Sequence, residues 1–157
     1  MITCELENGA KTSFRHVVLH AIVEKDGCLL LEKRAQHIPE GGKWGLPGGF
    51  LDRDETVEQG ILRELKEETG WDGEVIVLFR INSNPNRPKE ENRQNVALEF
   101  IVKVKEKTGE PDKESKEIRW FPIKDLPDFE EFAFDHSQTI KLYLQYKENQ
   151  FSLPIVV

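Results

Sequence analysis

Three glutamates, Glu64, Glu67 and Glu68, lie within five consecutive positions of the stretch RELKEETG, residues 63–70. On a helix, their i, i+3 and i+4 spacing brings the carboxylates together on one side, where each like-charge pair costs roughly a few tenths of a kcal/mol. Carboxylate oxygens are also the ligands that hard divalent cations such as Mg²⁺ prefer. From this stretch alone two interpretations remain open: a solvated face, in which Arg63 pairs with Glu67, or a metal site.

The apolar positions of the same helix favour the metal site. On a helical wheel of about 100° per residue, Val57, Ile61 and Leu65 form a stripe that we expect to pack on a sheet. Glu68 falls inside this stripe, where an ionised carboxylate is costly unless it is paired or coordinated. Gly60, which costs a helix up to about 1 kcal/mol relative to alanine, falls beside the carboxylates, and we expect it to leave open space for a ligand.

The rest of the chain predicts the elements that position this helix. The helix is expected at residues 56–69, with Gly70 as its stop. The turn signal Asp26-Gly27 between two apolar runs predicts a hairpin. A late helix is expected, with Ser137 as its N-cap, so the pattern indicates an α/β fold in which helices cover a mixed sheet. Strands are predicted at residues 16–24, 28–34, 75–81, 95–105 and 118–123.

Length, charge and the two termini limit the class of protein. The 157 residues fit one domain, 1–157, with a core from about 14 to 147. The net charge of −7 argues against nucleic acid or an anionic membrane as partner, because both attract basic surfaces. No apolar run approaches the ~18 residues of a spanning helix, and the N-terminus lacks a signal peptide, so we expect a cytoplasmic protein. The apolar tail, residues 153–157, allows a contact in a homodimer.

The longer stretch from Gly49 to Trp71 reads GFLDRDETVEQGILRELKEETGW. It contains a glycine, five residues, Glu55, seven residues and then RELKEETGW. This resembles the complete Nudix box, Gx5Ex7REUxEExGU with U an apolar residue, and every fixed position of the box is matched at residues 49–71. The preceding KWGLPGGF, residues 43–50, is similar to the lead-in of the same family. The chain is therefore identified as a member of the MutT/Nudix hydrolase family.

This resemblance implies an α/β/α sandwich with a mixed sheet in a single domain. It also implies an enzyme that uses Mg²⁺, or Mn²⁺, to hydrolyse the pyrophosphate of a nucleoside diphosphate linked to another moiety. Glu64 and Glu68 carry over as the principal metal ligands, with Glu67 as a further ligand or a catalytic base. This agrees with the metal site that the helical wheel favours, because bound metals clamp phosphate oxygens and activate water.

The other matched positions would support these ligands. The resemblance implies that Glu55 holds a metal-bound water or orients the box, and that Arg63 fixes the rotamer of a box glutamate. Gly48 and Gly49 would let the lead-in loop turn tightly and pass close to the metals.

Members of this family often use another acid from outside the box as a metal ligand or general base. Glu114, six residues before Trp120, lies in a stretch similar to one in the members that remove damaged nucleoside triphosphates. Glu117 and Glu99 are rival candidates, so the catalytic base stays open at this point.

Substrate choice in the family comes from segments outside the box. Residues 84–95 and 126–136 resemble segments of ADP-ribose pyrophosphatase-like members. Cationic groups of the first segment would reach a phosphate or ribose, and aromatic groups of the second would line a base or ribose pocket. The candidate substrate-binding residues are Arg87, Arg93, Phe134 and His136.

The preferred substrate is therefore ADP-ribose or a related nucleotide sugar. Two alternatives stay open: an oxidised nucleoside triphosphate such as 8-oxo-dGTP, and a catalytically silent regulatory module that only binds a nucleotide. A silent module is expected to lose box glutamates, and this chain keeps Glu64, Glu67 and Glu68.

Overall fold

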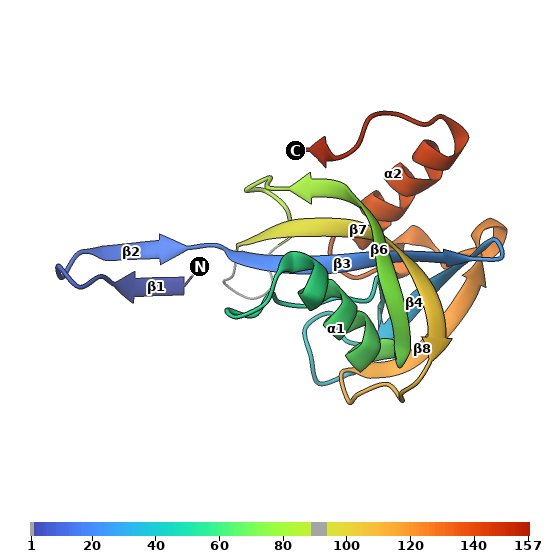
Figure 1. The fold of residues 1–157 in the computed structure, drawn as a ribbon, viewed down its shortest axis with the longest axis horizontal. Coiled ribbons are helices and arrows are strands. Elements are labelled where there is room, and N and C mark those ends of the chain that lie inside the picture. Colours follow the sequence, from blue (N-terminus) through green and yellow to red (C-terminus); the bar gives the residue numbers. More distant parts are fainter. Residues whose placement is uncertain (1, 89–93) are drawn as a thin grey trace.

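A mixed β-sheet runs through the centre of the protein (Figure 1). The structure is a computed structural model, and it describes residues 2–88 and 94–157. Within these residues the sheet has seven strands in the order β5-β4-β3-β7-β6-β9, and β8 also pairs with β4. The pairs β3–β7 and β6–β9 are parallel, and the other pairs of this sheet are antiparallel. The strands are β3 (His16–Lys25), β4 (Cys28–Arg34), β5 (Trp44–Gly45), β6 (Trp71–Asn82), β7 (Asn95–Lys107), β8 (Ser115–Pro122) and β9 (Ile155–Val156).

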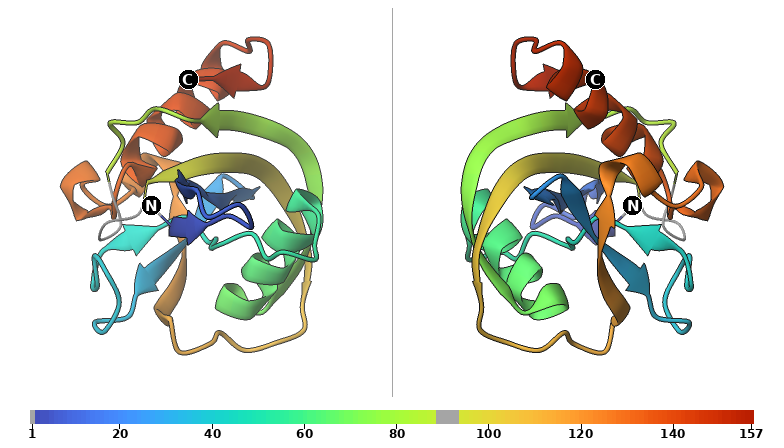
Figure 2. Two further views of the ribbon diagram at one scale, coloured as in Figure 1. Left: turned by 90° about the vertical axis from the view of Figure 1, so that its left-hand side faces the viewer. Right: turned by 90° about the vertical axis from the view of Figure 1, so that its right-hand side faces the viewer.

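The helices α1 (Val57–Thr69) and α2 (His136–Glu148) lie on opposite sides of the curved sheet (Figure 2). Successive side chains of a strand point to opposite faces, so β3 contributes to two cores. Leu19 packs in one core with Ile61 of α1, and Ile22 packs in the other with Ile140 of α2. The predicted α/β/α sandwich with a mixed sheet is confirmed. No helix among the described residues is both long and apolar enough to cross a bilayer.

The helix that carries the glutamates has clear signals at both ends. Thr56 is the N-cap, and its side chain accepts a hydrogen bond from the backbone N–H of Gln59, whose own side chain accepts one from the N–H of Thr56. This reciprocal capping box satisfies two donors that a helix start leaves unpaired. Gly70 ends the helix in the left-handed conformation (φ 76°), and its N–H donates to the carbonyl of Lys66.

Two expectations about the interior of α1 have different outcomes. Glu68 is buried, with 5% of its surface exposed, as the wheel predicted. The open space expected beside Gly60 is absent, because a Cβ there would lie 2.7 Å from both Leu19 Cδ1 and Glu55 Oε1. The glycine therefore allows α1 to pack closely on β3, and it does not make room for a ligand.

Several boundaries differ from the prediction. The strand expected at 75–81 begins at Trp71, because the chain enters the sheet directly after the helix stop. The N-cap of α2 is Asp135, and Ser137 already lies inside the first turn, so the predicted cap is wrong. The Asp135 side chain makes no capping hydrogen bond because it binds the guanidinium of Arg87 instead.

Strands also form near both ends of the chain. β1 (Ile2–Glu5) and β2 (Lys11–Phe14) pair as an antiparallel hairpin that projects from the body (Figure 1). The apolar tail docks on the sheet, where β9 pairs in parallel with β6. Short 3₁₀ turns, η1 (Ile123–Asp125) and η2 (Phe129–Glu131), lead from β8 to α2.

A buried polar network ties the sheet to α2. Glu99 of β7 is fully buried, and its Oε1 accepts a hydrogen bond of 2.9 Å from Thr139 Oγ1. Arg80 Nη1 lies 3.7 Å from the same oxygen. The Oε2 atom of Glu99 has no hydrogen-bond partner among the described residues. Burial raises the pKa of this carboxyl to about 7, although the charge of Arg80 opposes the shift.

Glu99→Gln should therefore change stability in a pH-dependent way. The pKa of Glu99 is raised in the folded state, so its contribution to stability is complete below its ordinary pKa of about 4.5 and is lost as pH rises through about 7. Relative to the variant, the wild type should lose up to about 3 kcal/mol of unfolding free energy between pH 5 and pH 8. Urea unfolding at both pH values measures this change, with the exposed Glu74→Gln as control. An equal difference at both pH values would contradict it.

Candidate functional site

The loop after β5 lies directly against strand β3. The N–H of Leu19 donates to the carbonyl of Gly49, and the N–H of Ala21 donates to that of Pro47, both at 2.8 Å. Gly48 has φ 152°, and a Cβ at this position would collide with the carbonyl of Leu19. The loop can therefore approach the strand this closely only because residue 48 is a glycine.

The same loop also touches two box glutamates. The N–H of Gly48 donates to Glu68 Oε2 at 2.6 Å. A Cβ on Gly49 would lie 2.6 Å from the carboxylate atoms of Glu64, so the glycine leaves a cradle that this carboxylate fills. Two consecutive glycines thus place the loop backbone directly against the carboxylates of Glu64 and Glu68.

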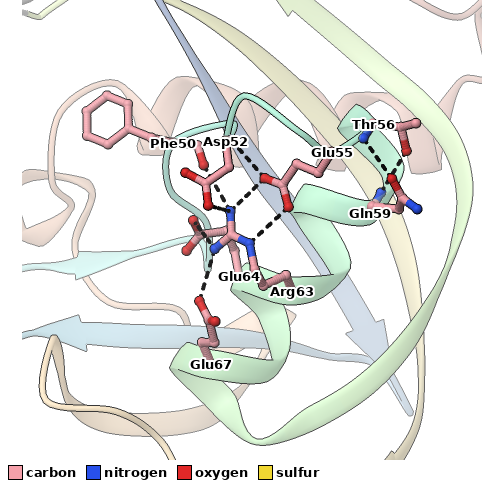
Figure 3. Close-up of polar contacts among 8 residues, drawn as sticks. All are labelled: Phe50, Asp52, Glu55, Thr56, Gln59, Arg63, Glu64 and Glu67. Carbon is pink, nitrogen blue, oxygen red and sulfur yellow. Dashed lines mark hydrogen bonds and ion pairs between the residues drawn. The ribbon is translucent and has the colours of Figure 1, made fainter.

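Arg63 organises the other carboxylates of the box (Figure 3). Its guanidinium donates to Glu55 at 2.7 and 3.0 Å, to Glu64 at 2.8 Å and to Glu67 at 3.0 Å. It also donates to the carbonyl of Phe50 at 3.1 Å, which ties the loop to the helix. The hydrogen bonds from Arg63 hold the pKa of Glu55 below its usual value. In return the carboxylates, Glu55 first and then Glu64 and Glu67, raise the pKa of Arg63.

Burial has the opposite effect on the deeper glutamates. Burial raises the pKa of Glu68 well above its usual value, and the negative charge of the neighbouring Glu32 adds to this shift. The hydrogen bond from the N–H of Gly48 opposes it. Burial also raises the pKa of Glu64, against the opposing effect of Arg63. Ionised carboxylates are therefore costly at Glu64 and Glu68 unless a cation is present. This cost favours the binding of a cation beside them.

These residues line a cleft of about 300 Å³. Most of the charged side chains that line it are acidic. Two of them, Asp112 and Glu114, come from the loop between β7 and β8. A hydrogen bond from the N–H of Asp112 to the carbonyl of Glu67 ties this loop to α1. The lining residues are Arg34, Gly48, Gly49, Phe50, Asp52, Arg63, Glu64, Glu67, Glu68, Asp112 and Glu114.

The three candidate acids outside the box lie in different places. Glu114 lines the cleft and is exposed. Glu117 lines a separate groove beside β8, and Glu99 is buried in the network with Thr139. Asp112 also lines the cleft, and the sequence reasoning missed it because no spacing in its turn distinguishes it from a surface carboxylate.

The carboxylates have the chemistry of ligands for a divalent cation, but their side chains do not converge on one point as a ligand set would. Among the residues that the structure describes, no three His, Cys, Asp or Glu side chains are positioned to hold a metal ion. The contacts explain this, because Arg63 binds Glu64 and Glu67 while Gly48 binds Glu68. The cleft is held together by an arginine and a backbone amide in this structure.

A second, smaller pocket of about 40 Å³ contains three of the candidate substrate-binding residues. Arg87, Phe134 and His136 lie there, whereas Arg93 lies outside the described residues. Phe134 has a left-handed backbone (φ 50°), which is uncommon for a bulky residue and marks a position that its surroundings hold in place. The pocket is lined by Val18, His20, Arg87, Pro88, Asn95, Phe134 and His136.

Hydrogen bonds fix the polar groups of this pocket. The N–H of Leu46 donates to His136 Nδ1 at 3.0 Å, so the neutral ring carries its proton on Nε2. Burial lowers the pKa of His136 to about 4, so the ring is neutral near pH 7. Asp135 holds Arg87 through two hydrogen bonds of 2.9 and 3.1 Å.

Three buried atoms of this pocket carry unused hydrogen-bonding capacity. His20 Nδ1, Arg87 Nη1 and Asn95 Oδ1 have no hydrogen-bond partner among the described residues. Buried polar atoms are normally paired, so the pocket suits a polar, uncharged group of a ligand. Sequence reasoning missed His20 and Asn95, because each lies in a strand pattern that reads as core.

An acidic cleft under a glycine loop, beside a polar pocket, suits an enzyme that receives a polyphosphate together with a divalent cation. Residues 13–143 match the family model described as NUDIX domain. An ADP-ribose pyrophosphatase from Methanocaldococcus jannaschii is 37% identical over 131 residues, which cover 83% of this chain and 74% of that protein. The chain therefore belongs to the Nudix family, and it is a Nudix pyrophosphohydrolase.

Solved structures show the same fold. A NUDIX hydrolase from Nitrosomonas europaea has a TM-score of 0.79 at 27% identity, with coverage of 95% of this chain and 82% of the other. A bifunctional NMN adenylyltransferase/ADP ribose pyrophosphatase from Francisella tularensis, complexed with AMP and a manganese ion, has a TM-score of 0.62 at 24% identity. That match covers 85% of this chain and 42% of the other.

Gly49→Ala should displace the carboxylate of Glu64 and weaken metal binding. The added methyl group would meet the end of a flexible side chain, so the fold should survive while affinity for Mn²⁺ falls at least about tenfold. Calorimetric titration with Mn²⁺ measures the affinity, and thermal unfolding checks the fold. Gly109→Ala, where a Cβ makes only ordinary contacts, is the matched control. Unchanged Mn²⁺ affinity in Gly49→Ala would show that the cradle does not position a ligand.

Proposed function

We propose that this enzyme hydrolyses ADP-ribose, or a closely related nucleotide sugar, in the presence of Mg²⁺ or Mn²⁺. The observation that carries this proposal is the pairing of an acidic cleft with a neighbouring polar pocket. The cleft suits the pyrophosphate with its cation, and the pocket suits an uncharged part of the substrate. The name of the Methanocaldococcus jannaschii relative supports the choice of ADP-ribose.

Glu64 and Glu68 would hold the metal, with Glu67 beside them. Their carboxylate oxygens fit a hard cation, and the cradle at Gly49 and the amide of Gly48 keep both side chains in the cleft. When bound, such an ion would neutralise phosphate charge and lower the pKa of a bound water. Arg63 would then keep Glu55 in place while it gives up part of its contact with Glu64.

Glu114 is the proposed proton acceptor from outside the box. It lines the cleft, and its exposure leaves it accessible to a water molecule beside the substrate. Glu67 stays the alternative, because it lies on the same cleft and is also exposed. Glu117 and Glu99 are not proposed, since neither lines the cleft.

At the second pocket, Arg87, Phe134 and His136 would bind a hydroxyl or ring-nitrogen group of the base or ribose, because a cavity of about 40 Å³ admits a polar group and not a whole ring. The neutral His136 would donate through Nε2, and Arg87 would donate through Nη1, an atom without a hydrogen-bond partner among the described residues. Phe134 offers an aromatic wall. These groups match hydroxyl and ring-nitrogen acceptors better than they match a further phosphate, because Asp135 already balances the charge of Arg87.

A substrate panel tests the proposal directly. The protein is incubated with Mg²⁺ and ADP-ribose, a nucleotide sugar, a dinucleoside polyphosphate or 8-oxo-dGTP, and release of AMP or phosphate is measured. We expect the highest kcat/KM for ADP-ribose, with no turnover after chelation of the metal. A higher kcat/KM for 8-oxo-dGTP would contradict the proposed substrate and favour the removal of oxidised nucleotides.

Glu68→Gln should abolish most of the activity, by at least about a hundredfold in kcat, because an amide replaces a carboxylate ligand in a buried position. Removing a buried charge should leave the melting temperature unchanged or higher. Glu58→Gln is the matched control, since Glu58 lies exposed in the first turn of the same helix. Full activity in Glu68→Gln would show that this residue is no ligand.

A further inference from the structure

The smaller pocket contains buried polar atoms of different hydrogen-bonding character. His20 comes from β3, Asn95 from the first position of β7, and Arg87 from the loop between these strands that follows β6. Each of the three residues is more than nine-tenths buried. Arg87 Nη1 only donates, Asn95 Oδ1 only accepts, and His20 Nδ1 does either according to its tautomer. None of these atoms has a hydrogen-bond partner within the described part of the chain, so the pocket calls for both a donor and an acceptor.

Contacts outside the pocket hold these side chains in place. Asp135 accepts hydrogen bonds from Nε and Nη2 of Arg87 at 3.1 and 2.9 Å, which fixes the direction of the remaining Nη1. Arg15 Nη2 donates to the backbone carbonyl of Asn95 at 2.7 Å. Burial lowers the pKa of His20 well below its usual value, so this ring is neutral near pH 7. The pocket is therefore organised before a ligand arrives.

The size of the pocket and its unpaired atoms select one kind of ligand group. A volume of about 40 Å³ admits a single small polar group. A carbonyl oxygen or a ring nitrogen only accepts, so it would leave Asn95 Oδ1 unpaired, and an amino group only donates, so it would leave Arg87 Nη1 unpaired. A hydroxyl donates once and accepts twice, so it satisfies both atoms and can also bind His20 Nδ1.

The aromatic ring at the same pocket indicates which half of the substrate carries this hydroxyl. Phe134 lines the pocket, and an aromatic face suits a nucleobase. A base is too large for a cavity of about 40 Å³ and would lie outside it, against the ring. A hydroxyl held close to a base belongs to the ribose to which that base is attached.

We propose that His20, Arg87 and Asn95 bind one hydroxyl of the nucleoside ribose, so that the enzyme selects ribonucleotides over analogues that lack this hydroxyl. The inference rests on the proposed function and deepens it, because it adds a requirement on the sugar. Asn95 is the specificity-determining residue, since its Oδ1 accepts the hydroxyl proton while Arg87 Nη1 donates to the hydroxyl oxygen. An analogue without the hydroxyl leaves both atoms buried and unpaired, which weakens its binding.

The test measures kcat/KM for ADP-ribose and for two analogues that lack the 2′- or the 3′-hydroxyl of the adenosine ribose. The wild type should prefer ADP-ribose over at least one analogue about ten- to hundredfold, the range expected when buried polar groups lose their partner. Asn95→Leu removes the acceptor and should reduce this preference at least about fivefold. A general disturbance of the structure lowers kcat/KM for all three substrates alike, so an unchanged preference in Asn95→Leu overturns the role of Asn95.

Two further variants distinguish the acceptor oxygen from the bulk of the side chain. Asn95→Asp keeps an acceptor oxygen and should retain most of the preference, whereas a loss as large as that of Asn95→Leu would contradict the acceptor role. Gln94→Leu is the matched control and should leave the preference unchanged. The side chain of Gln94 donates to the carbonyl of Pro85 at 3.0 Å, and Gln94 is not among the described residues that line the pocket.

Binding of ADP and of its 2′- and 3′-deoxy forms, measured by calorimetry at fixed Mg²⁺, separates this inference from the proposed function. If the wild type hydrolyses ADP-ribose and both analogues with equal kcat/KM, the function stands and the inference is overturned. If the wild type hydrolyses nothing on the panel, binding of ADP at least about tenfold tighter than that of one deoxy form still supports the inference. Equal binding of all three nucleotides in that case overturns it.

Discussion

The buried carboxylate of Glu68 is the constraint on which the rest of the site depends. It lies on the apolar side of α1, where a polar group must find a partner or a cation. The structure supplies the backbone N–H of Gly48, and this brings the loop within hydrogen-bonding distance of the helix. Glycine is required there because the same residue also lies against the carbonyl of Leu19. The carboxylate of Glu68 is thus linked, through Gly48, to the close contact between the loop after β5 and strand β3.

This loop supports both cavities of the site. The N–H of Leu46 fixes the ring of His136 in the smaller pocket, and two residues later the N–H of Gly48 fixes Glu68 in the cleft. The start of α2 is held in turn by the Asp135–Arg87 ion pair. A loop that fixes a group in each cavity would place the reacting phosphate of the proposed substrate accurately relative to its recognised group.

Much of the fold and of the cleft could be predicted from the sequence. The periodicity of α1 predicted its length to within one residue and the burial of Glu68, because a helix repeats its faces regularly along the chain. The strand pattern predicted the hairpin around Asp26-Gly27. The same wheel gave the wrong reason for Gly60, since it describes one helix and contains no information about the strand that packs on it.

The sequence by itself determined the family, the mixed sheet with its two helices, and the set of carboxylates, because these depend on short, regular spacings. Only the tertiary structure decided that Arg34, Asp112, His20 and Asn95 lie at the site and that Glu117 and Glu99 do not. The physical reason is that these positions depend on strand register, a register shift in the β4–β8 pairing, and loop closure. Each of these brings together residues far apart in the chain, and no local pattern records such contacts.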